Sequence, residues 1–512
     1  MSIRIGIDVG GTSTDAVAVD AADRLVAHAK AATSPEPFDG IAQALDAVLA
    51  QVDASEVTHA MLGTTHLTNA LLERRSLSRV GVLRLSAPAA TQPRPGTGWP
   101  PELAAVIGPV AVVGGGCEYD GSLIAELDEK AVRTFAESCV GKVGAVSVTG
   151  VFSAAHPAQE TRAAQIVSEI VGVPVSESHV VGGLSLIPRE NATILNAAII
   201  SVARNVIDGF HQALHARGLS VESYLTQNDG TLMAAEAAIR FPLLTVNAAM
   251  ANSMRGASRL SGLDDALVID VGGTTADMGL LVDGFPKQRV RGTEVAGIPT
   301  NFPTPQISSF AFGGGTLVKT SPALAVGPQS VGYRVTQDAL IGGGSRLTLS
   351  DVSAAAGRDV GFGDAALSAQ IPAALVSEAM GWVDQQVRRL VERHQVPQGG
   401  LPLLAVGGGA HLVGSDIPGV SQVIRPPHSA LANAYGAAIA EVSGSVDRVY
   451  NYDRFGREHC LDAAQEAAVD AAIQAGAKRG HVRVAAIKEV PLTYVTGQTC
   501  RVQVKATGPL RA

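Results

Sequence analysis

The sequence predicts an α/β protein made of two related halves and a small C-terminal α+β segment. One observation is a repeated motif: residues 7–15 and 269–277 share the order apolar residue, Asp, Val, Gly-Gly-Thr and a second Asp. Another is the alternation of apolar strand-like runs with helical patterns, which is typical of α/β folds. The composition agrees, because 46% of residues are hydrophobic, only 4% are aromatic and 56 are glycine, as expected for closely packed small side chains.

Each copy of the motif has the pattern of a strand, a tight turn and a second strand. Two adjacent glycines let the backbone turn sharply and bring N–H groups near a phosphate, while hydroxyls such as those of Thr14 and Thr275 can donate to its oxygens. The aspartate that ends each first strand, Asp8 or Asp270, is a hard oxygen ligand suited to Mg²⁺ or its water shell. We therefore expect two hairpins that face each other and hold a polyphosphate and its metal ion from both sides.

The residues after each hairpin indicate a third strand. A turn at residues 20–23 leads to an apolar run at 25–29, and a turn at 282–286 leads to a strand-like run at 288–291. Each half is thus expected to begin with a three-stranded meander. Because the same strand pattern surrounds both copies, the repeat is a stronger signal than a single Asp-x-Gly-Gly-Thr.

Length, charge and cysteines limit the classes of function. The 512 residues predict two to four domains, and we place them at 1–190, 191–445 and 446–512. The net charge is −8 without any basic cluster, which argues against nucleic acid and anionic membranes as partners. Four scattered cysteines suggest neither a disulfide framework nor a zinc site. The first strand begins at the N-terminus and no apolar run is long enough to span a bilayer, so we expect a soluble, cytoplasmic protein.

Two segments of the first half carry candidate acid/base groups. An apolar strand runs into Gly63-Thr64-Thr65-His66 and a helix over 68–74, so that a helix N-terminus would lie behind a polar turn. His66 is a candidate acid/base group, although a histidine at a helix start more often caps or packs. Glu118 follows three glycines, in either a substrate loop or a plain turn with solvated acids. The Pro- and Gly-rich residues 88–101 are expected to cross the surface or the site.

The second half contains long helical patterns and a glycine turn. A buried strand at 401–406 runs into Gly407-Gly408-Gly409, where the missing Cβ atoms would let the backbone lie against a base and a ribose. Asp351 follows another triple glycine and could lie near the cleft. The predicted helices are 192–214, 245–259, 372–395 and 429–442, and the tail has a helix at 463–477 and strands at 482–487 and 500–504.

In this order, the two hairpins and the glycine turn resemble the phosphate-1, phosphate-2 and adenosine elements of the actin/hexokinase/Hsp70 ATPase superfamily. Within it, residues 10–15, 63–74 and 270–277 resemble the hydantoinase A/oxoprolinase family, and the likeness extends to about residue 441. The resemblance implies two actin-like, RNase H-type domains around a nucleotide cleft. It also implies ATP-driven opening of a cyclic amide such as a hydantoin, 5-oxoproline or a related lactam.

The resemblance assigns roles to particular residues. Asp8 and Asp270 would hold Mg²⁺ or its waters, and a second divalent metal stays open. Family members often act with a second hydantoinase-type subunit, and some relatives are ATP-dependent carboxylases; homo-oligomerisation also stays open. The phosphate-gripping residues that the resemblance implies are Gly10, Gly11, Thr12, Gly272, Gly273 and Thr274, and the adenosine would lie against Gly407, Gly408 and Gly409.

The chain departs from the family pattern at two histidines. Leu62 stands where the family usually has a histidine before Gly-Thr-Thr, and residues 303–307 lack the histidine of the corresponding family segment. These departures leave the substrate and its metal use open. The chain also stops earlier than long family members, which favours dependence on a separate partner subunit.

The expected chemistry is phosphoryl activation of an amide. An unstrained amide is a poor electrophile, so transfer of the γ-phosphoryl group to the carbonyl oxygen would create a leaving group that water can displace. Mg²⁺, Thr12 and Thr274 would neutralise charge. The alternatives are a small-molecule kinase or an ATP-dependent carboxylase subunit on the same fold, and a nucleotide-switched assembly protein. The base that activates water stays open among Asp15, Asp277, His66 and Glu118.

Overall fold

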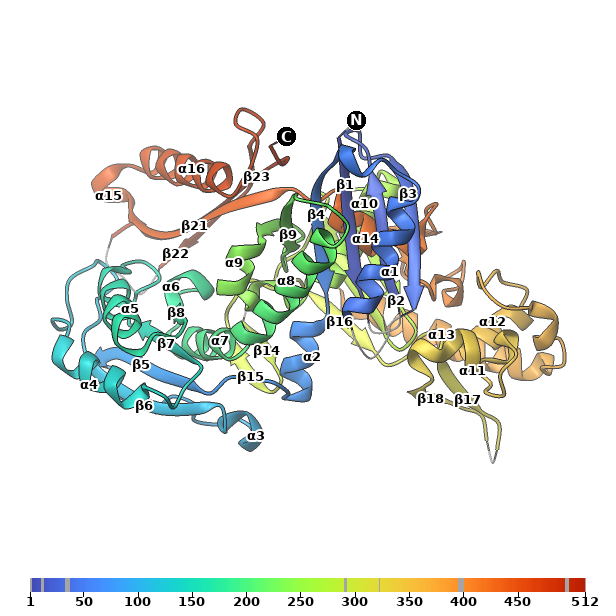
Figure 1. Cartoon of the computed structure of the whole chain (residues 1–512), viewed down its shortest axis with the longest axis horizontal. Helices are drawn as coiled ribbons and strands as arrows, with labels where there is room; N and C mark the ends of the chain where they lie inside the picture. Colours follow the sequence, from blue (N-terminus) through green and yellow to red (C-terminus); the bar gives the residue numbers. More distant parts are fainter. Residues whose placement is uncertain are drawn as a thin grey trace.

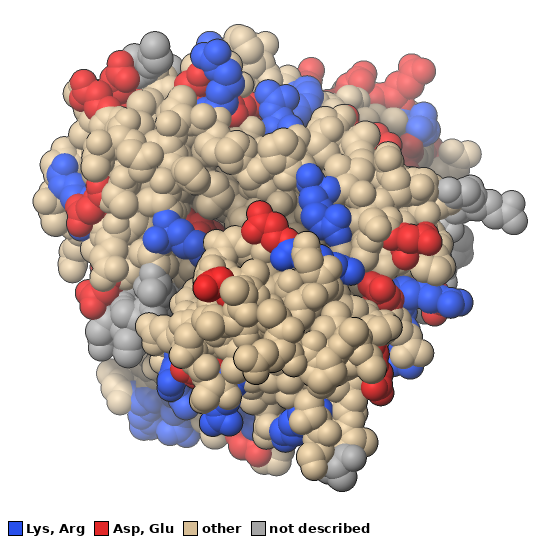
Figure 2. Space-filling model, turned by 90° about the vertical axis from the view of Figure 1, so that its right-hand side faces the viewer, with Lys and Arg blue, Asp and Glu red and all other residues tan. Residues whose placement is uncertain are grey.

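The computed structural model describes residues 2–10, 13–32, 37–289, 292–321, 323–394, 400–492 and 497–511. Two sheets lie near the centre of the molecule, and a third sheet, of parallel strands, lies to one side of them (Figure 1). Among the described residues, no helix combines the length and the apolar character needed to cross a membrane. On the face shown in Figure 2, positive and negative side chains are interspersed around a broad uncharged area.

The larger sheet contains the first copy of the motif. Its strand order is β22-β23-β21-β10-β9-β4-β1-β2-β3. β1 pairs antiparallel with β2 and parallel with β4, and β2 pairs antiparallel with β3, so the predicted meander is confirmed. The strands are β1 (Ile3–Val9), β2 (Ser13–Val19), β3 (Leu25–Ala32), β4 (Val57–Thr64), β9 (Glu222–Thr226), β10 (Leu232–Ala234), β21 (Val442–Asn451), β22 (Arg483–Pro491) and β23 (Thr499–Gly508).

The second sheet repeats this arrangement around the second copy. β11 pairs antiparallel with β12 and parallel with β19, as β1 does with β2 and β4. Of the predicted strand at 288–291, the described residues 288 and 289 do not form a strand. β13 ends at Pro286, Gln288 forms only an isolated bridge, and β16 supplies the longer pairing with β12. Residues 290–291 lie outside the described residues. The strands are β11 (Ala266–Val271), β12 (Ala276–Val282), β13 (Phe285–Pro286), β16 (Ile307–Phe310), β19 (Leu403–Val406) and β20 (Val423–Ile424).

Two helices fill the space between these sheets. α10 (Ala248–Ser261) packs on the second sheet and α14 (Ala432–Ala438) on the larger one. Glycines let their backbones touch: a Cβ on Gly256 would lie 1.9 Å from the carbonyl oxygen of Ala432, and one on Gly436 would lie 1.9 Å from that of Asn252. The helix is shorter than the predicted 429–442, because α14 ends at Ala438 and Val442 already begins β21.

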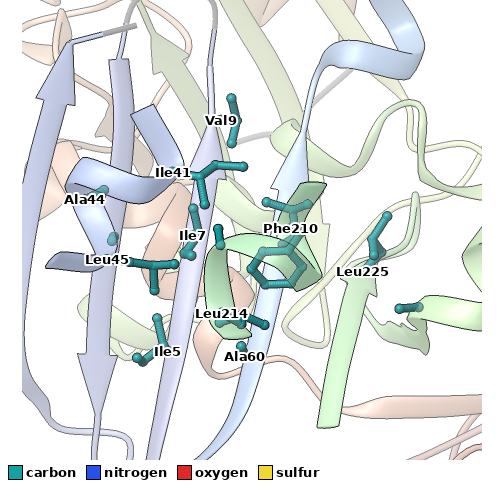
Figure 3. Close-up of a cluster of buried hydrophobic side chains, with 14 of the residues drawn as sticks. Ile5, Ile7, Val9, Ile41, Ala44, Leu45, Ala60, Phe210, Leu214 and Leu225 are labelled. Atoms are coloured by element: carbon teal, nitrogen blue, oxygen red, sulfur yellow. The ribbon is translucent and has the colours of Figure 1, made fainter. Parts of the chain in front are cut away.

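The opposite face of the larger sheet is covered by α1 (Pro37–Leu49) and α8 (Ile200–His215). Alternate residues of β1, namely Ile5, Ile7 and Val9, pack against Phe210 and neighbouring apolar side chains of both helices (Figure 3). Full burial of each such side chain contributes about 1.5 to 3 kcal/mol. This core fixes which face of β1 remains for polar side chains.

The parallel sheet has the order β6-β5-β7-β8. The predicted continuous helix at 192–214 is wrong: it is two helices, because α7 packs beside β7 whereas α8 packs on the larger sheet. A buried ion pair joins the sheet to α7, with Arg84 Nη2 at 2.6 Å from Glu190 Oε1. The elements are β5 (Val80–Ala87), β6 (Ile107–Gly114), β7 (Ala145–Gly150), β8 (Val175–Glu177), α4 (Glu129–Cys139), α5 (Ala158–Val171) and α7 (Leu186–Ala198).

Residues 88–101 lie against the parallel sheet and α7, and not against the two hairpins of the repeated motif. Arg84 Nη1 donates to the carbonyl of Pro93 at 2.8 Å, and the buried Trp99 donates from Nε1 to Asn191 Oδ1 at 3.0 Å. Asn191 in turn donates to the carbonyl of Pro299 at 2.9 Å in the hairpin of β14 (Thr293–Val295) and β15 (Ile298–Thr300).

The tail extends the larger sheet. β21 pairs with β10, β23 pairs with β21 along its whole length, and α16 (Arg457–Gln474) packs on both. The domain boundaries near residues 190 and 445 stay a prediction. Strand pairing crosses both positions: β4 pairs with β9 across the first, and β21 pairs with β23 across the second. The remaining helices and strands are α2 (His66–Glu73), α3 (Pro101–Ala104), α6 (Ser178–Val181), α9 (Ala235–Arg240), α11 (Val335–Asp338), α12 (Leu349–Ala355), α13 (Ala373–Arg393), α15 (Tyr452–Phe455), β17 (Thr316–Lys319) and β18 (Ala325–Ser330).

Candidate active site

The two hairpins have the same local geometry. Gly10 N donates to the carbonyl of Ser13 at 3.0 Å, and Gly272 N donates to that of Thr275 at 2.9 Å. Both hydroxyls donate to the second aspartate of their own motif at 3.2 Å, Ser13 to Asp15 and Thr275 to Asp277. Gly11 and Thr12, which are expected to grip phosphate, lie outside the described residues. The sequence repeat is thus a structural repeat.

Each hairpin carries a row of three polar side chains across three strands. In the first row, the register places Asp8 opposite Asp15 and Asp15 opposite Lys30. Lys30 Nζ lies 3.2 Å from Asp15 Oδ1. In the second row, Asp270 lies opposite Asp277 and Asp277 opposite Ser309, whose hydroxyl donates to Asp277. We call these the first row (Asp8, Asp15, Lys30) and the second row (Asp270, Asp277, Ser309).

The first row lies on the side of its sheet that faces the second sheet. Because side chains alternate along a strand, Asp8 points away from the core formed by Ile7 and Val9. Val17, which shares the face of Asp15, packs against α14, the helix between the sheets. The two rows are close enough that the charge of Asp270 affects the ionisation of Asp8.

The aspartates of the first row are hard to ionise. Burial and the neighbouring charges of Asp15 and Asp270 raise the pKa of Asp8 well above its ordinary value. Burial also raises the pKa of Asp15, although Lys30 opposes that shift. A cation placed among these carboxylates would relieve their repulsion.

The second row behaves in the same way. Burial raises the pKa of Asp270 to about 6, even though the hydroxyl of Ser253 on α10 donates to it. Burial raises the pKa of Asp277 as well, against hydrogen bonds from Ser309 and Thr275. Four carboxylates from two sheets therefore share one electrostatic environment.

These residues fit a magnesium ion. Asp8 Oδ1 is a buried oxygen without a hydrogen-bond partner, and carboxylate oxygens are the ligands that Mg²⁺ prefers. Within the described part of the chain, no three His, Cys, Asp or Glu side chains are arranged to hold a metal ion. Magnesium usually takes only one or two protein carboxylates and completes its shell with water and phosphate oxygens, so Asp8 and Asp270 remain the candidate ligands.

The turn after β4 lies beside the first hairpin. Gly63 pairs with Asp8, and a Cβ at this position would be 3.2 Å from Asp8 Oδ1, so the glycine gives the carboxylate its space. The predicted helix at 68–74 begins earlier, at His66, and Thr65 does not cap it with its side chain. His66 Nδ1 is 2.7 Å from Thr64 Oγ1, and burial lowers the pKa of His66. The predicted acid/base candidate is therefore at the edge of the site.

The glycine turn after β19 occupies the corresponding place in the second half. A Cβ on Gly407 would lie 2.2 Å from Asp270 Oδ1, and Gly409 N donates to the carbonyl of Val271 at 2.7 Å. A cavity of about 550 Å³ opens beside Gly407 and Gly408, lined also by Arg358, His411 and Arg425. Its position fits the predicted adenosine loop.

The two arginines of this cavity brace the turn that follows the glycines. Arg358 Nη1 donates to the carbonyl of Leu412 at 2.7 Å, and Arg425 donates to that of Val413. Burial and these two arginines lower the pKa of His411 to about 4. The two arginines thus hold the wall of the cavity through its backbone carbonyls, and the His411 imidazole in that wall is neutral at neutral pH.

Some residues of the site were missed in the sequence. Lys30 and Ser309 belong to the rows, and Ser253 donates to Asp270. The turn at 20–23 could have indicated Lys30, because the strand predicted after it, at 25–29, needs only one more residue to pair Lys30 with Asp15. Gly314 N donates to the carbonyl of Gly272 at 2.9 Å, so the triple glycine at 313–315 supports the second hairpin.

Two other candidates do not join the site. Glu118 lies on an exposed turn after β6, in the parallel sheet. Asp351 is fully buried and caps α12, with its carboxylate accepting from the backbone of Thr348 and Ile341, so it is not available to the cleft. Thr14, whose hydroxyl is predicted to donate to a phosphate, is buried, and this hydroxyl has no hydrogen-bond partner.

Comparison with known proteins gives a consistent picture. Residues 4–171 match the hydantoinase/oxoprolinase N-terminal region, and residues 189–358 match hydantoinase/oxoprolinase. An uncharacterised protein of Methanocaldococcus jannaschii is 24% identical over 393 residues, which is 70% of this chain and 57% of the relative. The caprolactamase subunit alpha of Pseudomonas jessenii is 26% identical over 384 residues, or 69% and 54%. The acetophenone carboxylase gamma subunit of Aromatoleum aromaticum is 26% identical over 254 residues, or 47% and 34%.

Two solved structures share the fold. ATP-dependent caprolactamase from Pseudomonas jessenii has a TM-score of 0.74 at 18% identity, covering 99% of this chain and 88% of that chain. Nucleotide-free acetone carboxylase has a TM-score of 0.70 at 18% identity, with the same coverage. The predicted α/β, actin-like fold class is thereby confirmed. The chain spans about half the length of the first two curated relatives. Since the two matched regions together cover more than half of it, the chain belongs to the hydantoinase/oxoprolinase family.

Proposed function

We propose that the chain binds Mg-ATP between the two hairpins and uses it to open a cyclic amide such as a hydantoin, 5-oxoproline or a related lactam. The observation that carries the proposal is the pair of matched rows. Asp8 and Asp270 occupy the last position but one of corresponding strands, and the charge of Asp270 raises the pKa of Asp8. Carboxylates that repel one another in a buried site favour a bound cation.

The chain's own groups bind and orient the nucleotide in this proposal. Asp8 and Asp270 hold the metal, and the cavity beside Gly407 and Gly408 receives the nucleoside. Bound Mg²⁺ would neutralise charge on the transferred phosphoryl group. Backbone N–H groups and hydroxyls of the hairpins would donate to the phosphates. In the second hairpin these donors are Gly273 and Thr274, because the Gly272 N–H and the Thr275 hydroxyl donate within the hairpin.

The proposed reaction makes the amide carbon electrophilic. Transfer of the γ-phosphoryl group to the carbonyl oxygen forms one P–O bond and breaks the bond to ADP. Water adds to the activated carbon, the ring C–N bond breaks, and a second water releases phosphate and leaves the ring-opened carboxylate. A base must take a proton from the attacking water.

Among the candidate bases, His66 is favoured by its ionisation. Burial lowers the pKa of His66, so its imidazole is unprotonated at neutral pH, as a base must be. Asp15 is engaged by Lys30, and Asp277 accepts hydrogen bonds from Ser309 and Thr275. Glu118 lies in the parallel sheet, outside this set.

We further propose that the chain acts with a second subunit. Two of its relatives are named as subunits, alpha of a caprolactamase and gamma of an acetophenone carboxylase. The second name, together with the fold shared with acetone carboxylase, supports an alternative in which the activated compound is carboxylated. A small-molecule kinase on the same fold would instead release a stable phosphorylated product.

Phosphate release from ATP and Mg²⁺ tests the proposal, measured with hydantoins, 5-oxoproline and lactams, each with and without bicarbonate. We expect one ring compound to stimulate release and the Asp8→Asn variant to lose the stimulation, whereas Asp46→Asn, at an exposed ion pair with Arg217, keeps it. Stimulation that requires bicarbonate would favour the carboxylase, and a phosphorylated product the kinase. ATP turnover unchanged in Asp8→Asn would contradict the site itself.

A further inference from the structure

Lys30 stands at the end of the first row, and the proposed reaction gives it no role. Its ammonium lies 3.2 Å from Asp15 Oδ1 and 3.4 Å from Oδ2, and its side chain is 52% exposed. The charge of Lys30 also reaches Asp8 and Asp270, the two candidate metal ligands on opposite sides of the cleft. Lys30 is therefore coupled to both hairpins.

The pair joins a half-exposed ammonium to a nearly buried carboxylate, with 52% of the Lys30 side chain and 12% of the Asp15 side chain exposed. Satisfying this carboxylate does not by itself require a lysine. In the second row, the corresponding place opposite Asp277 is taken by Ser309, whose hydroxyl satisfies the carboxylate without any charge. The two rows are otherwise matched, so the positive charge of the first row is a specific difference between the halves.

Lys30 lies at the end of the first row, and the cavity lies beside the second row. The cavity is lined by Gly407, and a Cβ on Gly407 would touch Asp270. In the first row, the strand register runs from Asp8 through Asp15 to Lys30. A nucleotide with its nucleoside in the cavity and its phosphates along these aspartates would have its terminal phosphate nearest to Lys30.

We propose that Lys30 leaves Asp15 to bind the terminal phosphate of a nucleoside triphosphate, and so lets the chain distinguish a triphosphate from a diphosphate. The inference rests on the proposed function, because it requires a nucleotide in this cleft. A flexible, half-exposed ammonium can make this movement, and an ammonium is a strong ligand for phosphate. The terminal phosphate then offers Lys30 a charged partner that a diphosphate lacks.

Calorimetric titration tests the inference, with Mg²⁺ present and AMP-PNP or ADP as the titrant. In the Lys30→Met variant, the affinity for AMP-PNP should fall by about tenfold to a hundredfold, the range of a hydrogen bond between charged groups, whereas the affinity for ADP should change little. Lys30→Arg keeps the charge and should restore most of the preference for AMP-PNP. Arg24→Met removes an exposed guanidinium that pairs with the buried Asp20 on the same meander, and it should bind both nucleotides like the wild type.

The outcomes separate this inference from the proposed function. If Lys30→Met binds AMP-PNP as the wild type does, or loses both nucleotides equally, the inference is overturned while nucleotide binding by the wild type still stands. If the wild type binds neither nucleotide, both proposals fail.

Discussion

The four aspartates of the rows differ in what surrounds them. Asp15 has Lys30, Asp270 has the hydroxyl of Ser253, and Asp277 has that of Ser309. Asp8 Oδ1 is buried without any hydrogen-bond partner, and its pKa is raised well above the ordinary value, first by burial. Asp8 is therefore the carboxylate that gains most from a bound cation.

Replacing Asp8 should separate function from stability. In Asp8→Asn we expect ATP turnover to be lost, while the melting temperature at neutral pH stays equal or rises, because the variant removes a buried carboxyl group that is hard to ionise and whose Oδ1 has no hydrogen-bond partner. Differential scanning calorimetry without divalent ions, together with phosphate release, checks both parts. A melting temperature several degrees below that of the wild type would mean that Asp8 holds the fold.

The raised pKa of Asp270 predicts a pH dependence of stability. Its pKa is about 6 in the folded chain against an ordinary value of 3.8, so between these values the folded chain binds a proton that the unfolded chain has lost. The free energy of unfolding contributed by Asp270 is thus fully present below the lower value and falls as pH rises through the higher one. At roughly 1.4 kcal/mol per pKa unit, the loss is at most about 3 kcal/mol.

Urea unfolding at about pH 5 and at about pH 7.5, with a chelator present, measures this effect. The two conditions lie on either side of the pKa of Asp270 in the folded chain. Asp270→Asn should reduce the difference in unfolding free energy between the two conditions, and Asp46→Asn, on the exposed surface, should leave it nearly unchanged. An equal difference in Asp270→Asn and the wild type would contradict the assignment.

Among the elements, α10 and α14 determine how the two sheets meet. α10 also carries Ser253, which donates to Asp270, and Asn252, which donates to Thr226 Oγ1 at 3.0 Å beside Gly63 and Asp8. Any separation of these helices would therefore move both rows. Glycines at the contact permit the close approach.

Adding a methyl group at this contact should destabilise the protein. In Gly256→Ala the new Cβ would lie 1.9 Å from the carbonyl oxygen of Ala432, and we expect a loss of about 1 to 3 kcal/mol, typical of an overpacked core. Gly381→Ala on α13 is the matched control, because a Cβ there meets no neighbour; helix propensity predicts a gain of about 0.5 to 1 kcal/mol. Similar unfolding curves for the two variants would contradict this packing argument.

The buried ion pair between Arg84 and Glu190 connects β5 with α7. Glu190→Gln leaves a buried guanidinium without its carboxylate, and breaking such a pair costs about 3 to 5 kcal/mol. We expect a lower melting temperature and an earlier cleavage of residues 88–101, since Arg84 also holds Pro93. Limited proteolysis followed by mass spectrometry would show it; a wild-type digestion pattern would argue against this role.

The sequence predicted the elements whose signals are local. Both hairpins, the glycine turn and several helices, including the one predicted at 245–259, follow from glycine, aspartate and apolar spacing within one short window. Lys30 and Ser309 were missed because their roles depend on the register between strands, and β16 lies about thirty residues beyond the hairpin it completes. The break between α7 and α8 was missed because helical periodicity continues across it while the packing surface changes.

At the scale of the whole molecule, the chain returns to its first sheet at the end. Strand pairing of β21 with β10 joins residues 442–508 to a sheet that begins at residue 3, which no local pattern could indicate. The larger sheet thus combines strands from both ends of the described chain. The tail shares a core with Met61 of β4 and Tyr224 of β9.

This pairing predicts the result of removing the tail. A chain ending at residue 445 would expose the core of Met61, Tyr224 and Leu232, and we expect it to aggregate or to unfold at a clearly lower temperature. Size-exclusion chromatography and thermal unfolding of the truncated chain measure this. A monodisperse truncated chain with the melting temperature of the full chain would show that the tail is an independent unit.

The central claim is that one magnesium nucleotide binds between the two rows. Equilibrium titration of AMP-PNP into the full chain, with and without Mg²⁺, tests it most directly, in the wild type and in Asp8→Asn and Asp270→Asn. We expect a single site in the wild type that requires Mg²⁺, and a large loss of affinity in either variant, because the metal would be held from both sides of the cleft. Binding that is independent of Mg²⁺, or unchanged in both variants, would contradict it.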